Sequence, residues 1–499
     1  MTTTSILRRC DVVPCLIAAA LSGCASGAPP YVKPQPPAPA DWTTWRAGDE
    51  TLRGTGGITE ALPENWWAPF EDPILDQLQT LAVAVSPDLQ TAALHFAQSR
   101  VQRLTVSAQR GPQANVTGAA TAQRQSEFGA GIRLIDAIGA DRDKIVPLIA
   151  EPYGFYQVGF DASWELDLWG RIRSSVEQAD ADVVRQGALL DLARVSLASD
   201  VARSFFEVRT TQRQSRVTRE EIAAMEDRLS IIEAQVEGGL FDELFLERQR
   251  ADLAALKSQL PPLLAREAAA GNEIALLVGE RPGALQNRLT ALPTDRAAIL
   301  PDLTLGLPSE LASRRPDIAA AEARLRAATA GIGIARAQLY PSIRLGARFG
   351  SESYLGTEFL SWGSRLWSIG PSFDLPIFDR GRRKSVVQLR ELEQQEAAVA
   401  YQRTLLAAWK EVDDALTGYT AEQQQRTELA AREQSARRAY DLAQARYDGG
   451  AVDYVAVLDS QRSYLQARFD LAGSDGRLLT RYVAINRALG NAPKLQRPD

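Results

Sequence analysis

Three groups of residues in this chain have types and spacings that could support chemistry. Asp413 and Asp414, close to Glu411, could act as paired carboxylates in acid–base catalysis, but they lie in a helix-forming stretch and are interpreted as a solvated helix face. His95 is the single histidine, which disfavours metal centres and catalytic triads because histidine is the commonest metal ligand and general base. The glycine-rich pieces lack the spacing and the lysine or aspartate of phosphate-binding motifs. We therefore expect no enzyme, no catalytic residues, no metal site and no cofactor.

The cysteines cluster near the N-terminus. Arg8-Arg9 precedes an apolar stretch over 12–21, which is too short to span a bilayer and is typical of a signal peptide. The stretch ends in Leu21-Ser22-Gly23-Cys24, which resembles a bacterial lipobox. That resemblance implies a signal peptide over 1–23 and lipid attachment at Cys24, with Ala25 favouring the outer membrane. An ordinary signal peptide with a chance cysteine is the alternative.

Composition excludes several classes of protein. The chain has 499 residues, of which 45% are hydrophobic and 24% charged, as in folded proteins. The net charge of −6 and the absence of a basic patch predict no nucleic-acid partner. Cys10 and Cys15 leave with the signal, so no disulfide framework is expected. A proline-rich stretch over 28–40 favours extended structure, and residues 24–60 are interpreted as a lipidated tether.

An internal repeat organises the rest of the chain. Gly170-Arg171 recurs as Gly381-Arg382, 211 residues later, and Gly238-Gly239 recurs as Gly449-Gly450 at the same offset. Pro112 recurs as Pro341 at an offset of 229, so the first copy carries 18 extra residues between Pro112 and Gly170. The sequence therefore predicts a duplicated unit, with a first repeat over 61–290, a second over 291–490 and a tail over 491–499.

Each copy contains two kinds of pattern. Apolar and polar residues alternate from Tyr156 to Asp167, which indicates a strand with one apolar face; strands are expected at about 113–124, 154–167, 341–350 and 367–377. Long proline-poor stretches of helix formers predict helices at about 171–237, 242–278, 382–447 and 453–489. The hairpin tips are expected at the glycine pairs Gly238, Gly239, Gly449 and Gly450, with Asp242 and Asp453 as caps of the returning helices.

Four strands cannot close a barrel, because the smallest transmembrane barrels have about eight. Open sheet edges are not tolerated in lipid, so the chain must oligomerise. Two copies would supply eight strands and three would supply twelve, and only wider barrels leave a water-filled lumen. The polar strand face would then line that lumen, with candidates Asp161, Glu165, Arg344, Arg348 and Asp374.

The chain resembles the TolC-like outer-membrane efflux proteins, in particular the lipoprotein branch often called NodT-type. The resemblance covers about residues 60–490 and includes the stretches Trp66–Pro73, Trp164–Arg171, Leu307–Leu311, Arg314–Ile318 and Leu375–Asp379. It implies an α+β membrane protein: a homotrimer with an intermolecular transmembrane β-barrel, long periplasmic α-helical hairpins forming an α-barrel, and a small mixed equatorial belt. Its location would be the outer membrane of a Gram-negative bacterium.

The resemblance also implies a function and partners. The trimer would be the passive exit duct of a tripartite efflux pump for drugs, toxic compounds or metal ions. An inner-membrane pump of the RND type would drive it through a periplasmic adaptor protein. Two alternatives stay open: the outer-membrane component of a type I protein or peptide secretion system, and a structural periplasmic coiled-coil lipoprotein with no channel.

Members of this family close their periplasmic end at the helical tips, with acidic rings and a tyrosine hydrogen bond. Tyr447 occupies the tyrosine position, and Asp459 and Asp453 are candidate acidic gate residues. A solvated carboxylate for Asp459 and simple helix packing for Tyr447 are the alternatives. Several family positions are replaced here, so the gate is expected to depend more on apolar packing; the replacements are Val452, Ala456 and Leu244-Phe245.

Overall fold

The computed structural model describes residues 29–33, 48–53, 65–130, 132–239, 242–290 and 314–491. The expected signal peptide, Cys24 and most of the tether and tail lie outside these ranges. The chain divides into two compact units. One comprises Met1–Val32, Ser99–Val183 and Arg324–Ala397, and the other comprises Lys33–Gln98, Val184–Ala323 and Ala398–Asp499. Each unit is described by itself.

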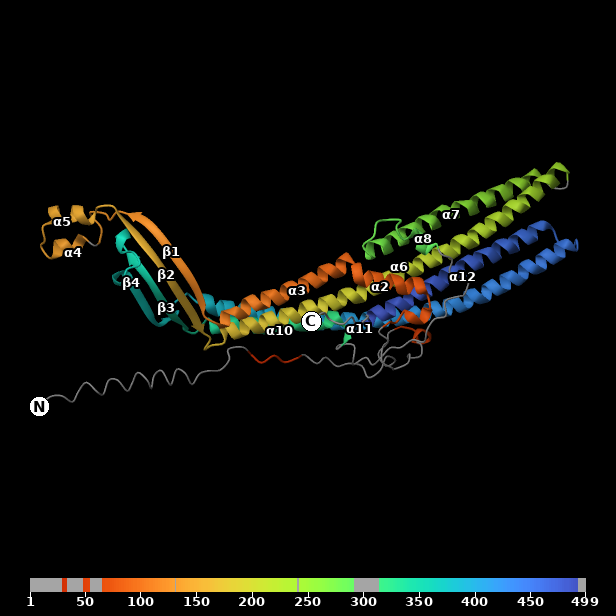
Figure 1. The fold of residues 1–499 in the computed structure, drawn as a ribbon. Coiled ribbons are helices and arrows are strands. Elements are labelled where there is room, and N and C mark those ends of the chain that lie inside the picture. Colours follow the sequence, from red (N-terminus) through yellow and green to blue (C-terminus); the bar gives the residue numbers. More distant parts are fainter. Residues whose placement is uncertain are drawn as a thin grey trace. The chain divides into compact units, whose positions relative to one another are not determined.

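The first unit contains one antiparallel sheet. Its strands β1 (Gln113–Gln123), β2 (Tyr153–Leu166), β3 (Ser342–Ser353) and β4 (Arg365–Asp374) lie side by side in the order β1-β2-β3-β4 (Figure 1). Each repeat supplies two strands, and the β2–β3 pair joins the repeats. Short 3-10 helices at Ala108–Arg110, Gly356–Glu358 and Trp362–Ser364 flank the strands.

Glycines allow β2 and β3 to approach closely. Gly159 and Gly350 are opposite one another in the register. A Cβ atom on Gly350 would lie 2.5 Å from the Val158 carbonyl oxygen and 2.9 Å from the Gly159 Cα. No side chain fits at such distances, so a substitution at Gly350 would force the two repeats apart at the centre of the sheet.

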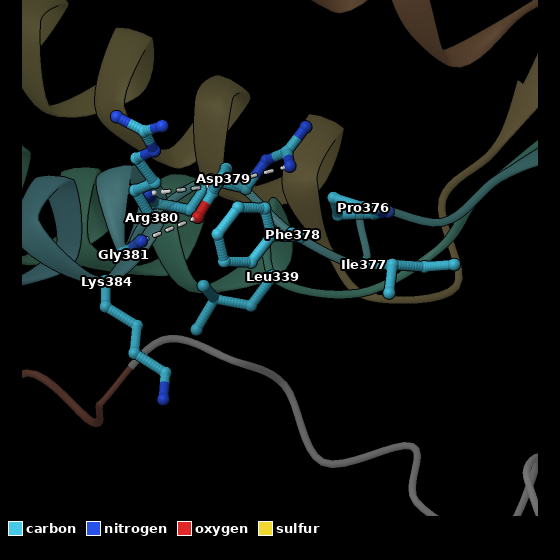
Figure 2. Close-up of a pocket in the computed structure, with 9 residues that line it drawn as sticks. Leu339, Pro376, Ile377, Phe378, Asp379, Arg380, Gly381 and Lys384 are labelled. Atoms are coloured by element: carbon cyan, nitrogen blue, oxygen red, sulfur yellow. Dashed lines mark hydrogen bonds and ion pairs between the residues drawn. The ribbon is translucent and has the colours of Figure 1, made fainter.

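The turn that follows β4 shows how a strand passes into a long helix (Figure 2). Gly381 has φ +84°, which glycine adopts without strain. The Asp379 carboxylate accepts hydrogen bonds from the backbone N–H of Gly381 at 3.1 Å and of Arg383 at 3.2 Å. A carboxylate satisfies free N–H groups at a helix N-terminus and complements its positive dipole end. Helix α11 (Arg382–Asp448) begins here.

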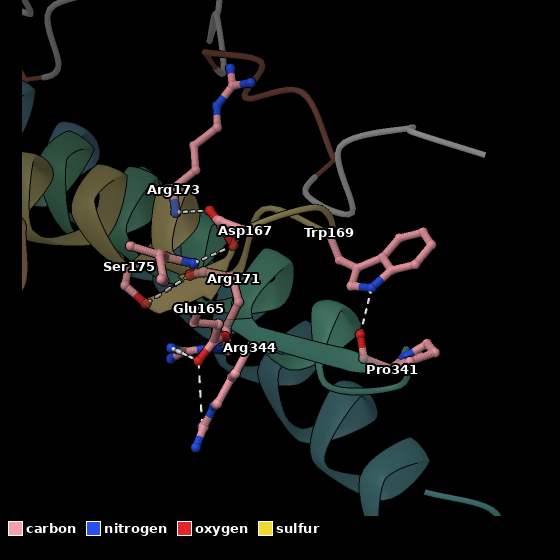
Figure 3. Close-up of polar contacts among 9 residues, drawn as sticks. Glu165, Asp167, Trp169, Arg171, Arg173, Ser175, Pro341 and Arg344 are labelled. Carbon is pink, nitrogen blue, oxygen red and sulfur yellow. Dashed lines mark hydrogen bonds and ion pairs between the residues drawn. The ribbon is translucent and has the colours of Figure 1, made fainter. Parts of the chain in front are cut away.

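The first repeat makes the same transition (Figure 3). Asp167 accepts hydrogen bonds from the N–H groups of Ile172 at 2.9 Å and Arg173 at 2.7 Å. Gly170 has φ +74°, and helix α6 (Arg171–Glu237) follows. The recurring Gly-Arg pair is therefore the strand-to-helix joint of each repeat.

In the second unit, α6 turns back into α7 (Glu243–Leu277), and α11 turns back into α12 (Tyr454–Ala488). Gly239 and Gly450 both have φ +71° at these turns. Asp242 and Asp453 cap the returning helices by accepting hydrogen bonds from the N–H groups of Leu244 and Ala456, each at 3.2 Å. None of the helices in the described part of the chain is long and apolar enough to span a membrane.

Two helices precede the strands and were not expected from the sequence. They are α3 (Pro87–Ser107) and α10 (Pro316–Ala337), and each begins with proline followed by aspartate. Proline suits the first helical position because it lacks the N–H that would have no partner there. Shorter elements complete the described chain: 3-10 helices at Glu50–Leu52 and Ala68–Phe70, and α2 (Pro73–Val85), α4 (Ile132–Ala137), α5 (Arg142–Ile149) and α8 (Gln286–Leu289).

A buried arginine holds the start of α10. The Arg315 guanidinium lies 2.7 Å from the carboxylates of Asp317 and Glu411 and donates to the Ala488 carbonyl oxygen at 2.8 Å. Its side chain is 7% exposed. It therefore ties α10, α11 and the end of α12 together, which gives the Arg-Pro-Asp segment a structural role.

Trp66 anchors the residues before α2 to the core of the second unit. It is fully buried, its ring lies 5.6 Å from that of Trp67, and it lies 6.1 Å from that of Tyr482 on α12. The core around it also includes Leu75, Phe205 and Ile274.

Replacing Trp66 by alanine should lower the free energy of unfolding by about 3–5 kcal/mol, because it leaves a large cavity in a packed core. Trp66→Phe keeps an aromatic ring and should lose much less. Thermal unfolding of the purified protein in detergent measures both. Equal melting temperatures for wild type and Trp66→Ala would contradict this role.

Candidate functional site

The lumen candidates lie on one face of the sheet and form cross-strand pairs. Asp161 is opposite Arg348 in the register, with 3.6 Å between their charged groups. Glu165 is opposite Arg344, at 3.5 Å. Opposite charges directly across two strands stabilise a sheet modestly. The structure thus brings the four residues together as two ion pairs, one above the other along β2 and β3.

The pair nearer the helices connects the sheet to α6. Glu165 also accepts from Arg171, with 2.8 Å between Nε and Oε1, and its side chain is 15% exposed (Figure 3). Thr117 on β1 donates its hydroxyl to Asp161 at 2.8 Å. Asp374 lies at the exposed end of β4. The polar face is therefore a ladder of paired charges of both signs, which water can wet without a strong preference for one sign of ion.

The other face of the sheet is apolar and exposed in the single chain. It carries Phe160, Phe349, Trp367, Ile369 and Phe373, each more than half exposed. Exposed apolar area of this extent on a sheet indicates contact with lipid or protein. One face suits a watery lumen and the other suits the surroundings of a membrane channel.

The hairpin tips place the gate candidates among aromatic rings. The Tyr447 ring lies 4.9 Å from that of Tyr454, and the Tyr454 ring lies 6.2 Å from that of Phe245. Burial raises the pKa of the Tyr454 phenol, an effect that the Arg228 guanidinium opposes. Tyr454 thus connects Tyr447 to Phe245, which is one of the positions where this chain departs from the family pattern.

The two acidic candidates have different surroundings. The carboxylate of Asp453 caps α12 by accepting from the Ala456 N–H. Asp459 is exposed, and its backbone carbonyl accepts from the Ser463 hydroxyl at 2.9 Å. Asp453 therefore has a structural task at the tip, whereas the Asp459 carboxylate faces solvent in the single chain.

Sequence reasoning missed Arg228, which links the two repeats near the tips. Its Nη2 donates to the Tyr440 hydroxyl on α11 at 2.5 Å, and its guanidinium lies 5.7 Å from the centre of that ring. The Tyr440 ring is stacked on Tyr464 of α12 at 6.1 Å. Nη1 of Arg228 is buried and makes no hydrogen bond within the described structure. No sequence signal identifies this contact, since it joins residues 212 positions apart.

Further ion pairs join the hairpins at greater distances from the tips. On α6, Glu220 lies 3.2 Å from Arg468, and Arg213 lies 2.7 Å from Asp475. Arg462 on α12 pairs with Asp252 on α7. These ion pairs connect the two hairpins of one chain away from their tips.

Glu221 lies within this interface. Burial raises the pKa of its carboxyl to about 7, and Arg468 partly offsets the effect. Because this carboxyl group on α6 is half-buried, its charged form is less stable than it would be in water, and ionisation of Glu221 therefore destabilises the folded state.

The paired carboxylates singled out in the sequence, Asp413 and Asp414, lie on helix α11. Asp414 pairs with Lys410 one helical turn away, and both side chains are exposed. Within the described ranges, no group of three or more His, Cys, Asp or Glu side chains is placed to hold a metal ion.

Comparison with known proteins connects this architecture to a family. The family model "Outer membrane efflux protein" matches residues 78–280 and 307–491. The pyoverdine export outer membrane protein OpmQ of Pseudomonas putida is 31% identical over 487 residues, covering 97% of this chain and 98% of that protein. The cation efflux system protein CusC of Escherichia coli is 27% identical over 484 residues, covering 96% and 98%.

Comparison with solved structures indicates the same family. The outer-membrane channel OprN superposes with a TM-score of 0.80 at 30% identity, covering 92% of this chain and 99% of that one. The predicted fold class is confirmed: α-helical hairpins with a small sheet whose strands contribute to an intermolecular transmembrane barrel. Members of this family are channel proteins of the outer membrane. This chain belongs to the outer membrane efflux protein family.

Proposed function

We propose that three copies of this chain form the exit channel of a tripartite efflux pump, held in the outer membrane by lipid on Cys24. The observation that carries the proposal is the four-stranded sheet with paired charges on one face and exposed aromatic residues on the other. Three such sheets supply twelve strands, a number that leaves a lumen. The chain is then a passive duct and not an enzyme.

The partners follow from that role. The duct receives its cargo from an inner-membrane pump of the RND type through a periplasmic adaptor that docks at the hairpin tips. The names of the relatives refer to pyoverdine export and cation efflux, and both cargoes are small. Their size favours small molecules or ions as cargo over the protein-secretion alternative.

The gate in this proposal lies at the hairpin tips. Tyr447, Tyr454 and Phe245 supply an aromatic cluster, and Arg228 holds the first-repeat hairpin to the second through Tyr440. Asp459, exposed near the tip, acts on the ions that pass. Asp453 contributes mainly by fixing the turn.

The purified trimer in a planar bilayer should show discrete, low-conductance, cation-preferring events, because the resting tips are closed. Asp459→Asn should reduce the cation preference or enlarge the conductance, since it removes a negative charge at the constriction. An Asp459→Asn channel with unchanged conductance and selectivity would remove Asp459 from the gate. A verified trimer that stays silent in both forms would refute the channel.

Arg228→Met should raise the frequency of channel opening, because it removes the hydrogen bond to Tyr440 while keeping an apolar side chain of similar length. Arg228→Lys retains the charge but not the planar, multiply donating group, and should fall between wild type and Arg228→Met. Opening is counted in single-channel records at one voltage. The control is Arg250→Met, which removes ion pairs within the first hairpin only. An equal frequency of opening in Arg228→Met and wild type would exclude a role in gating for the contact between Arg228 and Tyr440.

Glu221 predicts a pH dependence of stability. Its folded-state pKa of about 7 lies above the ordinary value of 4.5, so the folded state binds the proton more tightly than the unfolded chain. The free energy of unfolding should therefore fall as pH rises from about 4.5 to about 7. Glu221→Gln should flatten this slope and stabilise the protein most at pH 8, as measured by thermal unfolding. Glu237→Gln, at an exposed position on the same helix, should keep the wild-type slope. A wild-type slope in Glu221→Gln would contradict the assignment.

A further inference from the structure

The extra residues of the first repeat form a small folded insert between β1 and β2. Helices α4 and α5 lie beyond the ends of these strands (Figure 1) and pack through Ile132, Ile135 and Val146, all buried. Four other large apolar side chains point outward, with exposed fractions of 87% for Phe128, 67% for Leu134, 69% for Ile138 and 71% for Leu148.

The insert is fixed to the strands by polar contacts. Arg124 donates to the Ala150 carbonyl at 3.0 Å and pairs with Glu127 at 2.8 Å. Arg142 donates to the Glu127 carbonyl at 3.2 Å and lies over the Phe128 ring at 5.6 Å. The outward apolar side chains thus belong to a folded insert that is fixed to the strands, and their high exposure makes the insert a candidate for contact with protein or lipid.

A second apolar surface lies on the turn between β3 and β4. Leu360 has φ +69°, a strained value for leucine. Its N–H donates at 3.1 Å to the buried Ser351 hydroxyl, which is 2.7 Å from that of Ser364. This network holds Leu360 outward at 63% exposure beside Trp362 at 81%. This turn therefore presents Leu360 and Trp362 as a second exposed apolar surface.

The two surfaces lie at the same end of the sheet and near opposite edges. Gln123 is opposite Tyr153, and Ser351 is opposite Arg365, so both connections leave the sheet at one end. Strand β1 forms one edge of the described sheet and β4 the other. In an oligomeric barrel the β4 edge of one copy pairs with the β1 edge of the next, because lipid does not tolerate unpaired edges. That pairing brings the β3–β4 turn of one copy to the insert of its neighbour.

We propose that the outward apolar face of the α4–α5 insert binds the β3–β4 turn of the adjacent copy, with Leu360 and Trp362 packed against Leu134, Ile138 and Leu148. The contact rests on the proposed trimer and extends its interface past the strands. It explains why an insert found in only one repeat carries so much exposed apolar surface: one insert and one turn per copy suffice to close a ring of three.

The test uses two full-length chains with different tags, co-expressed in one cell. One carries Ile138→Cys and the other Leu360→Cys, in a chain whose natural cysteines are confined to Cys10, Cys15 and Cys24. A short bis-maleimide added to purified trimers should yield a covalent dimer that carries both tags. Arg173→Cys, at the other end of the sheet, replaces Ile138→Cys in the control and should give none.

Thermal dissociation of the trimer provides a second readout. Ile138→Ser and Leu360→Ser should each lower the dissociation temperature, and the double variant should lose little more than either single variant, because both remove one contact. Additive losses would contradict the contact.

Other outcomes overturn the inference in distinguishable ways. Covalent dimers formed by the Ile138→Cys chain alone would mean that the α4–α5 inserts of two copies contact each other. Quenching by spin-labelled phospholipid of a fluorophore attached to the Ile138→Cys variant, without cross-linking to Leu360→Cys, would mean that lipid covers the face. Trimers that conduct but never cross-link would contradict the proposed contact and leave the proposed channel standing. An unmodified chain that forms no trimer and does not conduct would instead refute the proposed function.

Discussion

The constraint on which the rest of the structure depends is that backbone hydrogen-bonding groups in lipid must find partners within protein. A sheet of four strands satisfies its inner strands and leaves the outer edges of β1 and β4 open. One chain of this family is therefore incomplete in the membrane, and copies must complete one another. The exposed aromatic face, the paired polar face and the close approach of Gly159 to Gly350 are consistent with a sheet built for closure.

In the proposed channel the helical part meets a different requirement, because the tips of the proposed gate must separate. Each hairpin has a glycine turn and an aspartate cap that fix the geometry of its tip, so each hairpin can move as a unit. The contacts between hairpins include ion pairs, the hydrogen bond from Arg228 to Tyr440 and the ring contact between Phe245 and Tyr454. A largely exposed ion pair, such as that of Glu220 with Arg468, contributes only about 0–1 kcal/mol. Apolar packing is extensive around Trp66 and Tyr482.

Much of this arrangement could be predicted from the sequence. Alternation from Tyr156 to Asp167 indicates a strand with two unlike faces. The four expected strands and the long helices indicate an oligomeric barrel, and the resemblance to the efflux proteins implies the rest of the confirmed fold class. The helices α3 and α10 are not among the helices predicted from the sequence, although Pro87-Asp88 and Pro316-Asp317 are ordinary helix starts. Arg228 could not be found, since its partners come from the other repeat and no local pattern specifies them.

The tips carry apolar residues at positions where the resemblance to the family implies polar ones. Leu244-Phe245 and Val452 cannot form ion pairs, yet Phe245 contacts Tyr454, which in turn contacts Tyr447. An aromatic contact contributes about 0.5–1.5 kcal/mol beyond area burial and is insensitive to salt, whereas an exposed ion pair is screened. The gate proposed above, closed by rings and a single guanidinium, should therefore respond to the mechanical separation of the hairpins more than to ionic strength. Such a response is consistent with the proposed opening by contact with an adaptor.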